Sequence, residues 1–235
     1  MDNPQTYTAI VSSIIRMAGN FYVAKFRLTD SKEIVFAAGQ YVIFLIGVPK
    51  NRHTLSIASP PSVKNDVEIL QSVAPMGEGS KWLLGLKPGD TVQFIGPLGK
   101  FILQKESPRQ KVFVATGCGY APLRSMIHDY LDSGGTAPVR LWWGMRYETD
   151  VLWQEELASL AARYPNFHYT VTLSKPAESW TGSRGRVTQH VAGETPELPA
   201  SEFYLCGSRQ MIVDMRELLT QNGVPSGQLY TETFF

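Results

Sequence analysis

The sequence is poor in the features that mark metal clusters, disulfides and membrane spans. It contains 2 cysteines, Cys118 and Cys206, and 4 histidines, and these form no CxxC motif or Cys/His cluster. An iron–sulfur centre held by four cysteines of this chain is therefore excluded. No apolar run approaches the roughly 20 residues that a membrane-spanning helix needs, and the stretch MDNPQTYTAIVSSIIRM lacks the basic segment of a signal peptide. We expect a cytoplasmic protein without membrane insertion.

Net charge is also nearly absent. The 235 residues carry 22 Lys+Arg against 21 Asp+Glu, which gives a net charge of +1. Because this balance creates no field that would gather nucleic acid, we predict that nucleic acid is not a partner. The length suits one large domain or two smaller ones, each with a core that needs no disulfide or metal.

The first hundred residues have the pattern of short strands. Segments rich in β-branched and aromatic residues are separated by turn residues at roughly ten-residue spacing, which predicts an antiparallel barrel or sandwich. A single helix is predicted from about Ser80 to Leu86, between a serine and a Pro-Gly stop. The predicted strands are YTAIVSSII, NFYVAKFRLT, GQYVIFLIGV, TLSIAS, DVEILQSV, DTVQFIG and KFIL.

The pattern changes after the polar stretch QKESPRQ, which we interpret as a domain boundary. From KVFVATG onward, strand-like segments alternate with helical ones, and this alternation predicts βαβ units and a parallel sheet. The predicted helices are APLRSMIHDYLDS, DVLWQEELASLAARY and SRQMIVDMRELLTQNG. We therefore predict a β domain over residues 1–106 and an α/β domain over residues 107–235.

Glycine turns follow three predicted strands of the α/β domain. FVATGCGYAPLRSM places Gly117 and Gly119 between a strand and a helix, LWWGMR places Arg146 just beyond a strand end, and FYLCGSRQM repeats the strand–glycine–helix pattern. Ligands of open parallel sheets bind at this edge, where helix N-termini attract phosphate groups. Each stretch also has a plainer explanation: a tight turn, a surface arginine, and a cysteine used for packing.

The β domain offers a second possible anion site. In GEGSKWLLGLKPGD, Gly79, Ser80 and Lys81 stand at the start of the predicted helix. One phosphate site on each domain suits a flavin dinucleotide on the first and a nicotinamide dinucleotide on the second. If no flavin binds, Ser80 is an ordinary helix cap.

Taken together, these motifs resemble those of the ferredoxin reductase-like flavoproteins, above all the reductase components of bacterial ring-hydroxylating oxygenases and the flavin reductases. LSIAS is similar to the end of the flavin motif RxYSxxS, and GEGSKWLLGLKPGD and GPLGKF are similar to the phosphate helix and the turn after it. TGCGYAPLRSM, WGMR, CGSRQM and ETFF match the family's GTGIAPxxS, YGxR, CGPxxM and its ending of glutamate and aromatic. The resemblance covers almost the whole chain, in the family's order.

The resemblance implies an FAD-binding antiparallel Greek-key β-barrel followed by an NAD(P)-binding parallel α/β domain. Ser56 would lie at the flavin N5 edge, Ser80 and neighbouring amides would hold the pyrophosphate, and Glu232 would complete the hydrogen bonds beside the flavin. Phe234 in the ending YTETFF would cover one flavin face until the nicotinamide displaces it. Residues that would hold or border the nicotinamide nucleotide are Gly117, Gly119, Pro122, Arg146, Cys206 and Gly207.

The chain departs from the family pattern at several of these positions. Aligned on SIAS, the family's tyrosine position holds Leu55 and its arginine position holds His53, with Arg52 one residue earlier. Leucine cannot stack on the flavin, and a mostly neutral histidine is a poorer pyrophosphate partner than arginine. A one-residue bulge would allow Arg52 to take the arginine's place. Cys118 and Ser208 replace the family's threonine and proline without abolishing their turns.

The reaction implied is hydride transfer from the reduced nicotinamide to FAD, followed by electron delivery to an acceptor. Ser174, Lys175 and Arg184 could read the 2′-phosphate of NADPH, whereas SWTGSRGRVT resembles the same stretch of NADH-using reductases, and we favour NADH slightly. The leading hypothesis is a reductase that serves a separate oxygenase or iron–sulfur protein. The alternatives are a free flavin or ferric reductase with exchangeable flavin, and a regulatory subunit that binds flavin or nucleotide without turnover.

Overall fold

The computed structural model describes residues 4–29, 33–47 and 51–234, and the chain divides into two units. The first unit is Met1–Leu103 together with Arg124–Asp129, and the second is Gln104–Leu123 with Tyr130–Phe235. The boundary that we predict after residue 106 lies just beyond this division and stays a prediction.

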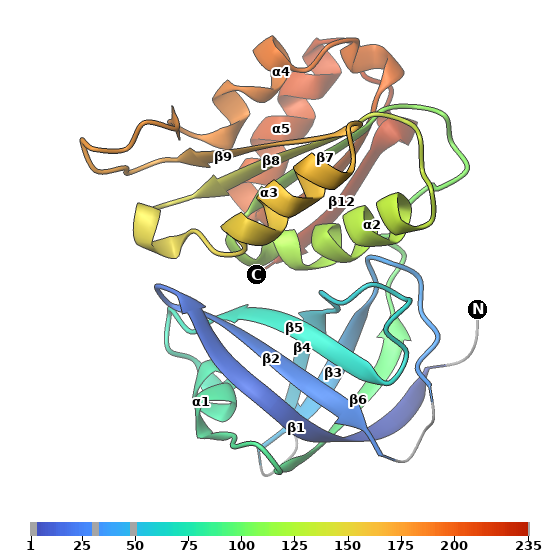
Figure 1. Ribbon diagram of the computed structural model, residues 1–235, viewed down its shortest axis with the longest axis vertical. Helices are drawn as coiled ribbons and strands as arrows, with labels where there is room; N and C mark the ends of the chain where they lie inside the picture. Colours follow the sequence, from blue (N-terminus) through green and yellow to red (C-terminus); the bar gives the residue numbers. More distant parts are fainter. Residues whose placement is uncertain (1–3, 30–32, 48–50, 235) are drawn as a thin grey trace. The chain divides into compact units, whose positions relative to one another are not determined.

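The first unit is built on a six-stranded antiparallel sheet in the order β4-β3-β6-β1-β2-β5. An isolated bridge between Ile57 and Ile69 joins the end of one edge strand to the other edge strand, so the sheet curls into the predicted barrel (Figure 1). Its strands are β1 Gln5–Ala18, β2 Phe21–Leu28, β3 Tyr41–Ile46, β4 Asn51–Ser56, β5 Asp66–Ser72 and β6 Thr91–Leu98, with helix α1 at Glu78–Gly85.

Strand alternation decides which side chains fill the barrel. Along β3 the side chains of Val42, Phe44 and Ile46 are buried in the core, and the residues between them are half-buried. Six of the seven predicted strands are confirmed in approximate position. The prediction of a strand over KFIL is wrong, because Gly99 turns the chain at φ 104° after β6 and residues 101–104 form no regular element.

The second unit contains a parallel six-stranded sheet in the order β10-β9-β8-β7-β11-β12, which confirms the α/β prediction. Figure 1 shows α2 and α3 on one face of this sheet and α4 and α5 on the other. The strands are β7 Lys111–Thr116, β8 Val139–Met145, β9 Phe167–Leu173, β10 Ser183–Arg184, β11 Glu202–Ser208 and β12 Leu229–Phe234. The helices are α2 Tyr120–Asp132, α3 Gln154–Arg163, α4 Val191–Glu194 and α5 Arg209–Gln221.

The order of these strands creates a topological switch point. The chain starts at β7, builds β8 and β9 on one side, and then returns to place β11 and β12 on the other side. The connections after β7 and β11 therefore leave the sheet in opposite directions. In open α/β sheets, ligands bind in the crevice outside the carboxyl ends of two such strands.

Two neighbouring residues of β8 lie on opposite faces of the sheet. Trp142 packs into the core beneath α4 and α5, whereas the ring of Trp143 lies against Tyr120 of α2. Both tryptophans are fully buried. Among the described residues, no helix is long and apolar enough to cross a membrane.

Candidate functional sites

The loop after β7 forms the first half of the switch-point crevice. Gly117 adopts φ 53°, a left-handed conformation that favours glycine, and begins a short 3₁₀ helix, η1 (Gly117–Gly119), that leads into α2. No side chain caps η1 or the start of α2. The backbone donors of this turn suit the phosphate oxygens of a dinucleotide.

The turn after β11 forms the second half, and it packs backbone against backbone on the first. A Cβ atom on Gly119 would lie 2.0 Å from the carbonyl oxygen of Cys206. A Cβ atom on Gly207, which adopts φ 145°, would lie 2.2 Å from Oγ1 of Thr116. Thr116 Oγ1 also accepts a hydrogen bond of 3.0 Å from the amide of Ser208. These glycines are needed because the two turns approach so closely.

Arg146 lies at the same edge of the sheet, after β8. The end of β8 lies close against β7: a Cβ atom on Gly144 would be 3.2 Å from Thr116 Cγ2. Arg146 is exposed, and its guanidinium lies 5.5 Å from the ring centre of Tyr147. Its side chain is therefore accessible to a nucleotide bound along the edge.

Cys206 is a poor candidate for a nucleophile. Its side chain is fully buried, and burial, followed by the nearby Glu232 and Cys118, raises the pKa of its thiol well above the ordinary value. Parallel pairing places Cys206 opposite Glu232 of β12. The structure thus brings two predicted residues together at the crevice and keeps the thiol protonated.

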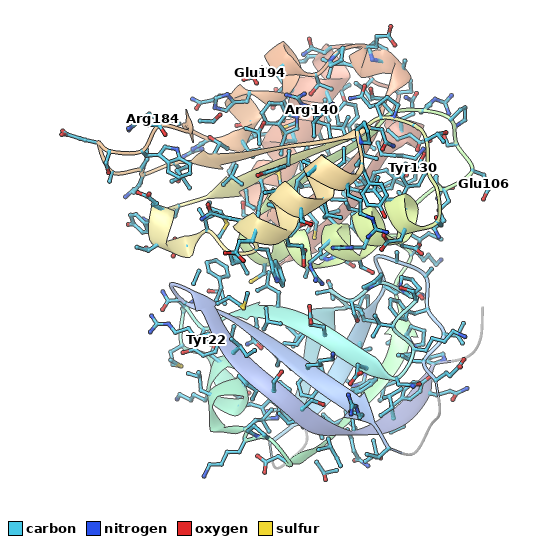
Figure 2. All side chains as sticks on the ribbon, in the orientation of Figure 1. Tyr22, Glu106, Tyr130, Arg140, Arg184 and Glu194 are labelled. Atoms are coloured by element: carbon cyan, nitrogen blue, oxygen red, sulfur yellow. The ribbon has the colours of Figure 1, made fainter. Side chains whose placement is uncertain are left out.

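The loop after β9 carries the predicted coenzyme-selecting residues. The amides of Ser174 and Lys175 donate to the carbonyl oxygens of Met145 and Arg146, at 3.0 and 2.9 Å. Arg184, labelled in Figure 2, lies in the two-residue strand β10, directly after the loop that follows β9. Its Nη2 lies 3.0, 2.8 and 2.6 Å from the carbonyl oxygens of Ala177, Glu178 and Trp180, so Arg184 holds the loop in shape.

In the first unit, the predicted flavin-binding residues of β4 lie on two opposite faces of the strand. Leu55 pairs with Val42 and His53 with Phe44, so both point toward the interior side of the barrel. Arg52, Thr54 and Ser56 alternate with them on the outer side, opposite the half-buried Leu45, Ile43 and Tyr41. No bulge interrupts this β3–β4 pairing, so simple alternation, rather than the bulge that we considered, turns Arg52 outward.

Leu55 therefore points toward the interior of the barrel, and its predicted place beside the flavin stays a prediction. It is 9% exposed and belongs to the barrel core. The outward residue two positions after Arg52 is Thr54, and it is exposed. The alignment on SIAS did not reveal this, because it fixed residue identity without fixing the face of the strand.

Helix α1 starts earlier than the sequence indicated. It begins at Glu78 with Gly77 as the capping residue, so Ser80 lies within the first turn and is not the cap. The Ser80 hydroxyl donates to the carbonyl of Pro75 at 3.4 Å. Lys81, in the same turn, is exposed and makes its backbone hydrogen bond to Gly77, as an ordinary helical residue does.

His53 packs directly beneath the start of α1. A Cβ atom on Gly79 would lie 2.3 Å from the imidazole Cε1, and the ring meets Trp82 edge-on at 6.0 Å. Burial lowers the pKa of His53, and Gln71 partly opposes this shift. Its Nε2 is buried and has no hydrogen-bond partner with acceptable geometry. The imidazole is therefore kept neutral and supports the helix from below.

Two structural roles escaped the sequence analysis. Thr116 joins the β7 and β11 turns, and Trp143 donates from its indole Nε1 to the carbonyl of Gly117 at 3.0 Å. A threonine directly before the loop glycine is a usable signal for the first role, but no local pattern indicates the second. The predicted cover by Phe234 concerns a side chain outside the described residues, and it stays a prediction.

Comparison with known proteins assigns a cofactor to each unit. The family described as Oxidoreductase FAD-binding domain matches residues 8–102, and the Oxidoreductase NAD-binding domain matches residues 113–217. Ferredoxin–NADP reductase B of Sorangium cellulosum is 35% identical over 218 residues, covering 89% of each chain. The toluate 1,2-dioxygenase electron transfer component of Pseudomonas putida is 28% identical over 230 residues, covering 97% of this chain and 67% of the relative.

Solved structures share the fold. The cytochrome P450 reductase GcoB of Amycolatopsis superimposes with a TM-score of 0.92 at 24% identity, covering 98% of this chain and 70% of that one. The fold and sites define an FAD-dependent oxidoreductase that uses a nicotinamide coenzyme. The chain belongs to the ferredoxin reductase-like family of flavoproteins.

The residues of both units fit these cofactors chemically. The uncapped turn after β7, with left-handed Gly117, offers backbone donors to the phosphates of the nicotinamide nucleotide. The outer face of β3 and β4 offers an apolar strip, Tyr41, Ile43 and Leu45, beside the cationic Arg52. Such a strip beside a guanidinium suits a planar ring joined to a pyrophosphate.

Proposed function

We propose that this protein oxidises a reduced nicotinamide coenzyme and delivers the electrons, through bound FAD, to a separate acceptor protein. FAD supplies the step from two-electron hydride chemistry to single-electron transfer when it is bound. The observation that best supports the proposal is the close backbone packing of Gly119 on Cys206 at the switch point. Relatives that are electron transfer components of dioxygenases support a protein acceptor.

On the first unit, we propose a flavin site on the outer face of β4. Arg52 would pair with the pyrophosphate, helped by Ser80, by the amide of Gly79 at the start of α1 and by the exposed ammonium of Lys81. Ser56 would donate at the N5 edge; it lies on the outer side of β4 and is 4% exposed. His53 would act indirectly, because its imidazole packs beneath Gly79.

On the second unit, we propose that Gly117, Gly119 and Pro122 form the phosphate-binding turn and that Arg146 pairs with a phosphate or ribose. Cys206 and Gly207 would border the nicotinamide. At Gly207 the close approach of Thr116 leaves no room for a larger residue. Glu232, opposite Cys206 in the sheet, would accept hydrogen bonds beside the flavin, and Phe234 would cover it.

We further propose NADH as the preferred coenzyme. A 2′-phosphate requires a cation that is free to approach it, but Nη2 of Arg184 already contacts three carbonyl groups of its own loop. Lys175 and Ser174 remain as the residues that could read such a phosphate. The cytoplasmic location expected from the sequence also remains a prediction.

The second candidate function is a flavin reductase whose flavin exchanges. The exposed Thr54 favours it, because a threonine provides no ring to stack on the isoalloxazine where the outer face of β4 would meet it. Desalting separates the two functions: a protein that keeps its yellow colour is a flavoenzyme with resident FAD, and a protein that loses it uses flavin as a substrate.

Anaerobic stopped-flow spectroscopy tests the leading proposal. The FAD-loaded protein is mixed with NADH or NADPH, and bleaching of the flavin absorption is followed. Rapid bleaching, followed by reoxidation on addition of an iron–sulfur protein, is the expected result. Absence of bleaching with both coenzymes would contradict the proposal and leave a non-catalytic binding subunit.

A further inference from the structure

A buried indole lies directly beneath the loop that follows β7. Trp143 is in β8, its side chain is fully buried, and Nε1 donates to the carbonyl oxygen of Gly117 at 3.0 Å. Gly117 is the residue that starts η1 in the left-handed conformation. The hydrogen bond therefore acts on the residue at which β7 passes into η1.

The same side chain also contacts the other end of the turn. Its ring lies 4.4 Å, centre to centre, from the ring of Tyr120, the first residue of α2. Trp153 also packs edge-on against Tyr120, at 5.7 Å. Trp143 thus fixes the residue before and the residue after Cys118–Gly119, and no side chain of the loop caps either helix.

We propose that Trp143 is a positioning residue that sets the conformation of the loop for the nicotinamide nucleotide. In a trans peptide the C=O and the following N–H point in opposite directions. When the indole holds the Gly117 carbonyl toward the sheet, the amide of Cys118 is directed away from it, toward the outer side of the turn. This inference rests on the proposed function in one respect: it assumes that the phosphates of the nicotinamide nucleotide bind on the outer side of the turn.

The chain supplies a matched control in the next residue. Trp142 is equally buried and also uses its indole Nε1, which donates to Thr195 Oγ1 at 3.3 Å. It lies on the opposite face of the sheet, where the Arg140 guanidinium is 4.6 Å from its ring centre and the His190 ring stacks on it at 6.1 Å. Figure 2 labels Arg140 on this face, together with Glu194. Trp143→Phe and Trp142→Phe each remove one buried indole donor.

Binding of NAD⁺ to the FAD-loaded protein, measured by calorimetry, tests the proposal without requiring turnover. We expect Trp143→Phe to weaken binding about tenfold, which corresponds to loss of one buried hydrogen bond of about 1.4 kcal/mol. Trp142→Phe should bind as the wild type does. In turnover with NADH, Trp143→Phe should raise KM by a similar factor and change kcat little, provided that chemistry is slower than coenzyme release.

Thermal unfolding separates positioning from general damage. Both variants should lower Tm by similar amounts, and only Trp143→Phe should change NAD⁺ binding. If Trp143→Phe does not fold, 3-benzothienylalanine at position 143 keeps the shape of the ring and lacks only the N–H donor. Equal binding losses in the two variants, or unchanged binding with the benzothiophene, would overturn the inference. Failure of the wild type to oxidise NADH would instead refute the proposed function.

Discussion

Gly119 packs on the carbonyl group of Cys206 so closely that a methyl group on Gly119 would lie 2.0 Å from the oxygen. Gly119→Ala must therefore separate the β7 and β11 turns. We expect a loss of about 1–3 kcal/mol in the free energy of unfolding, as for other overpacked sites, and weaker NAD⁺ binding. Gly193→Ala is the control, because no atom lies within 4 Å of a Cβ there. Urea unfolding and calorimetry measure both effects, and equal behaviour of the two variants would contradict this explanation.

Substitutions at Arg52 and at Leu55 should have different effects, the first on FAD affinity and the second on stability. Arg52 lies on the outer face of β4, so Arg52→Gln should weaken FAD binding about tenfold or more by loss of a charged contact and leave the unfolding of the apoprotein unchanged. Leu55 lies in the barrel core, so Leu55→Ala should cost about 2–5 kcal/mol of stability. Flavin fluorescence titration and urea unfolding measure the two. If Arg52→Gln binds FAD normally, the proposed outer-face site is wrong.

A buried ion pair lies at the opposite end of the parallel sheet. Lys111 Nζ lies 3.1 Å from Glu202 Oε2 and also donates to the carbonyls of Ser107 and Arg109, at 2.6 and 3.0 Å. Lys111→Met removes the buried cation and leaves the Glu202 carboxylate with the Tyr204 hydroxyl at 3.2 Å and the half-exposed Arg109 guanidinium at 3.8 Å. The change should cost about 3 kcal/mol. The double variant Lys111→Met/Glu202→Gln should recover much of that loss in urea unfolding. If the double variant is no more stable than Lys111→Met, loss of the ion pair is not the cause of the destabilisation.

The burial of His53 predicts a dependence of stability on pH. Its pKa in the folded protein is lowered from 6.5, so below that pH the unfolded chain binds a proton more readily than the native one. The free energy of unfolding should therefore fall as the pH drops from 6.5 through the folded pKa. In His53→Gln this part of the decline should disappear. Urea titrations across this range measure it, and identical slopes in wild type and variant would refute the assignment.

Coenzyme choice can be tested at Lys175. If Lys175 is the residue that reads a 2′-phosphate, Lys175→Glu should lower kcat/KM for NADPH at least tenfold by placing like charges together. The value for NADH should change little. Arg184→Lys, by contrast, should loosen the loop after β9 and affect both coenzymes, since the carbonyl contacts of Arg184 hold that loop. Unchanged use of NADPH by Lys175→Glu would remove Lys175 from this role.

Much of the architecture follows from local pattern. Both sheets, the helices α2, α3 and α5, and the glycine turns at Gly117 and Gly207 are predictable, because hydrophobic period and turn residues act over short distances. The two-residue β10 and the four-residue α4 were not predicted. Elements this short have no period of their own, and tertiary contacts decide whether they form.

The sites could be predicted less completely than the fold. Motif order indicated the glycine turns after β7 and β11, and their binding of a nucleotide stays a prediction. The face to which Leu55 points depends on strand register, which is set by pairing with Val42. The support of Gly117 by Trp143 spans 26 residues of sequence and leaves no local signature. The engagement of Arg184 with its own loop likewise becomes visible only in three dimensions.

The position of β7 at the centre of its sheet has a consequence for folding. Its pairing with β8 places Lys111 opposite Val139, and its pairing with β11 places Lys111 opposite Glu202. The segment between Lys111 and Glu202 is much longer than the segment between Lys111 and Val139. Closing the longer loop costs more chain entropy, so the β8–β9 wing is expected to assemble before the β11–β12 wing. The contact between the β7 and β11 turns is then the last part of this unit to form, so we expect a partly folded chain to lack the proposed nicotinamide site.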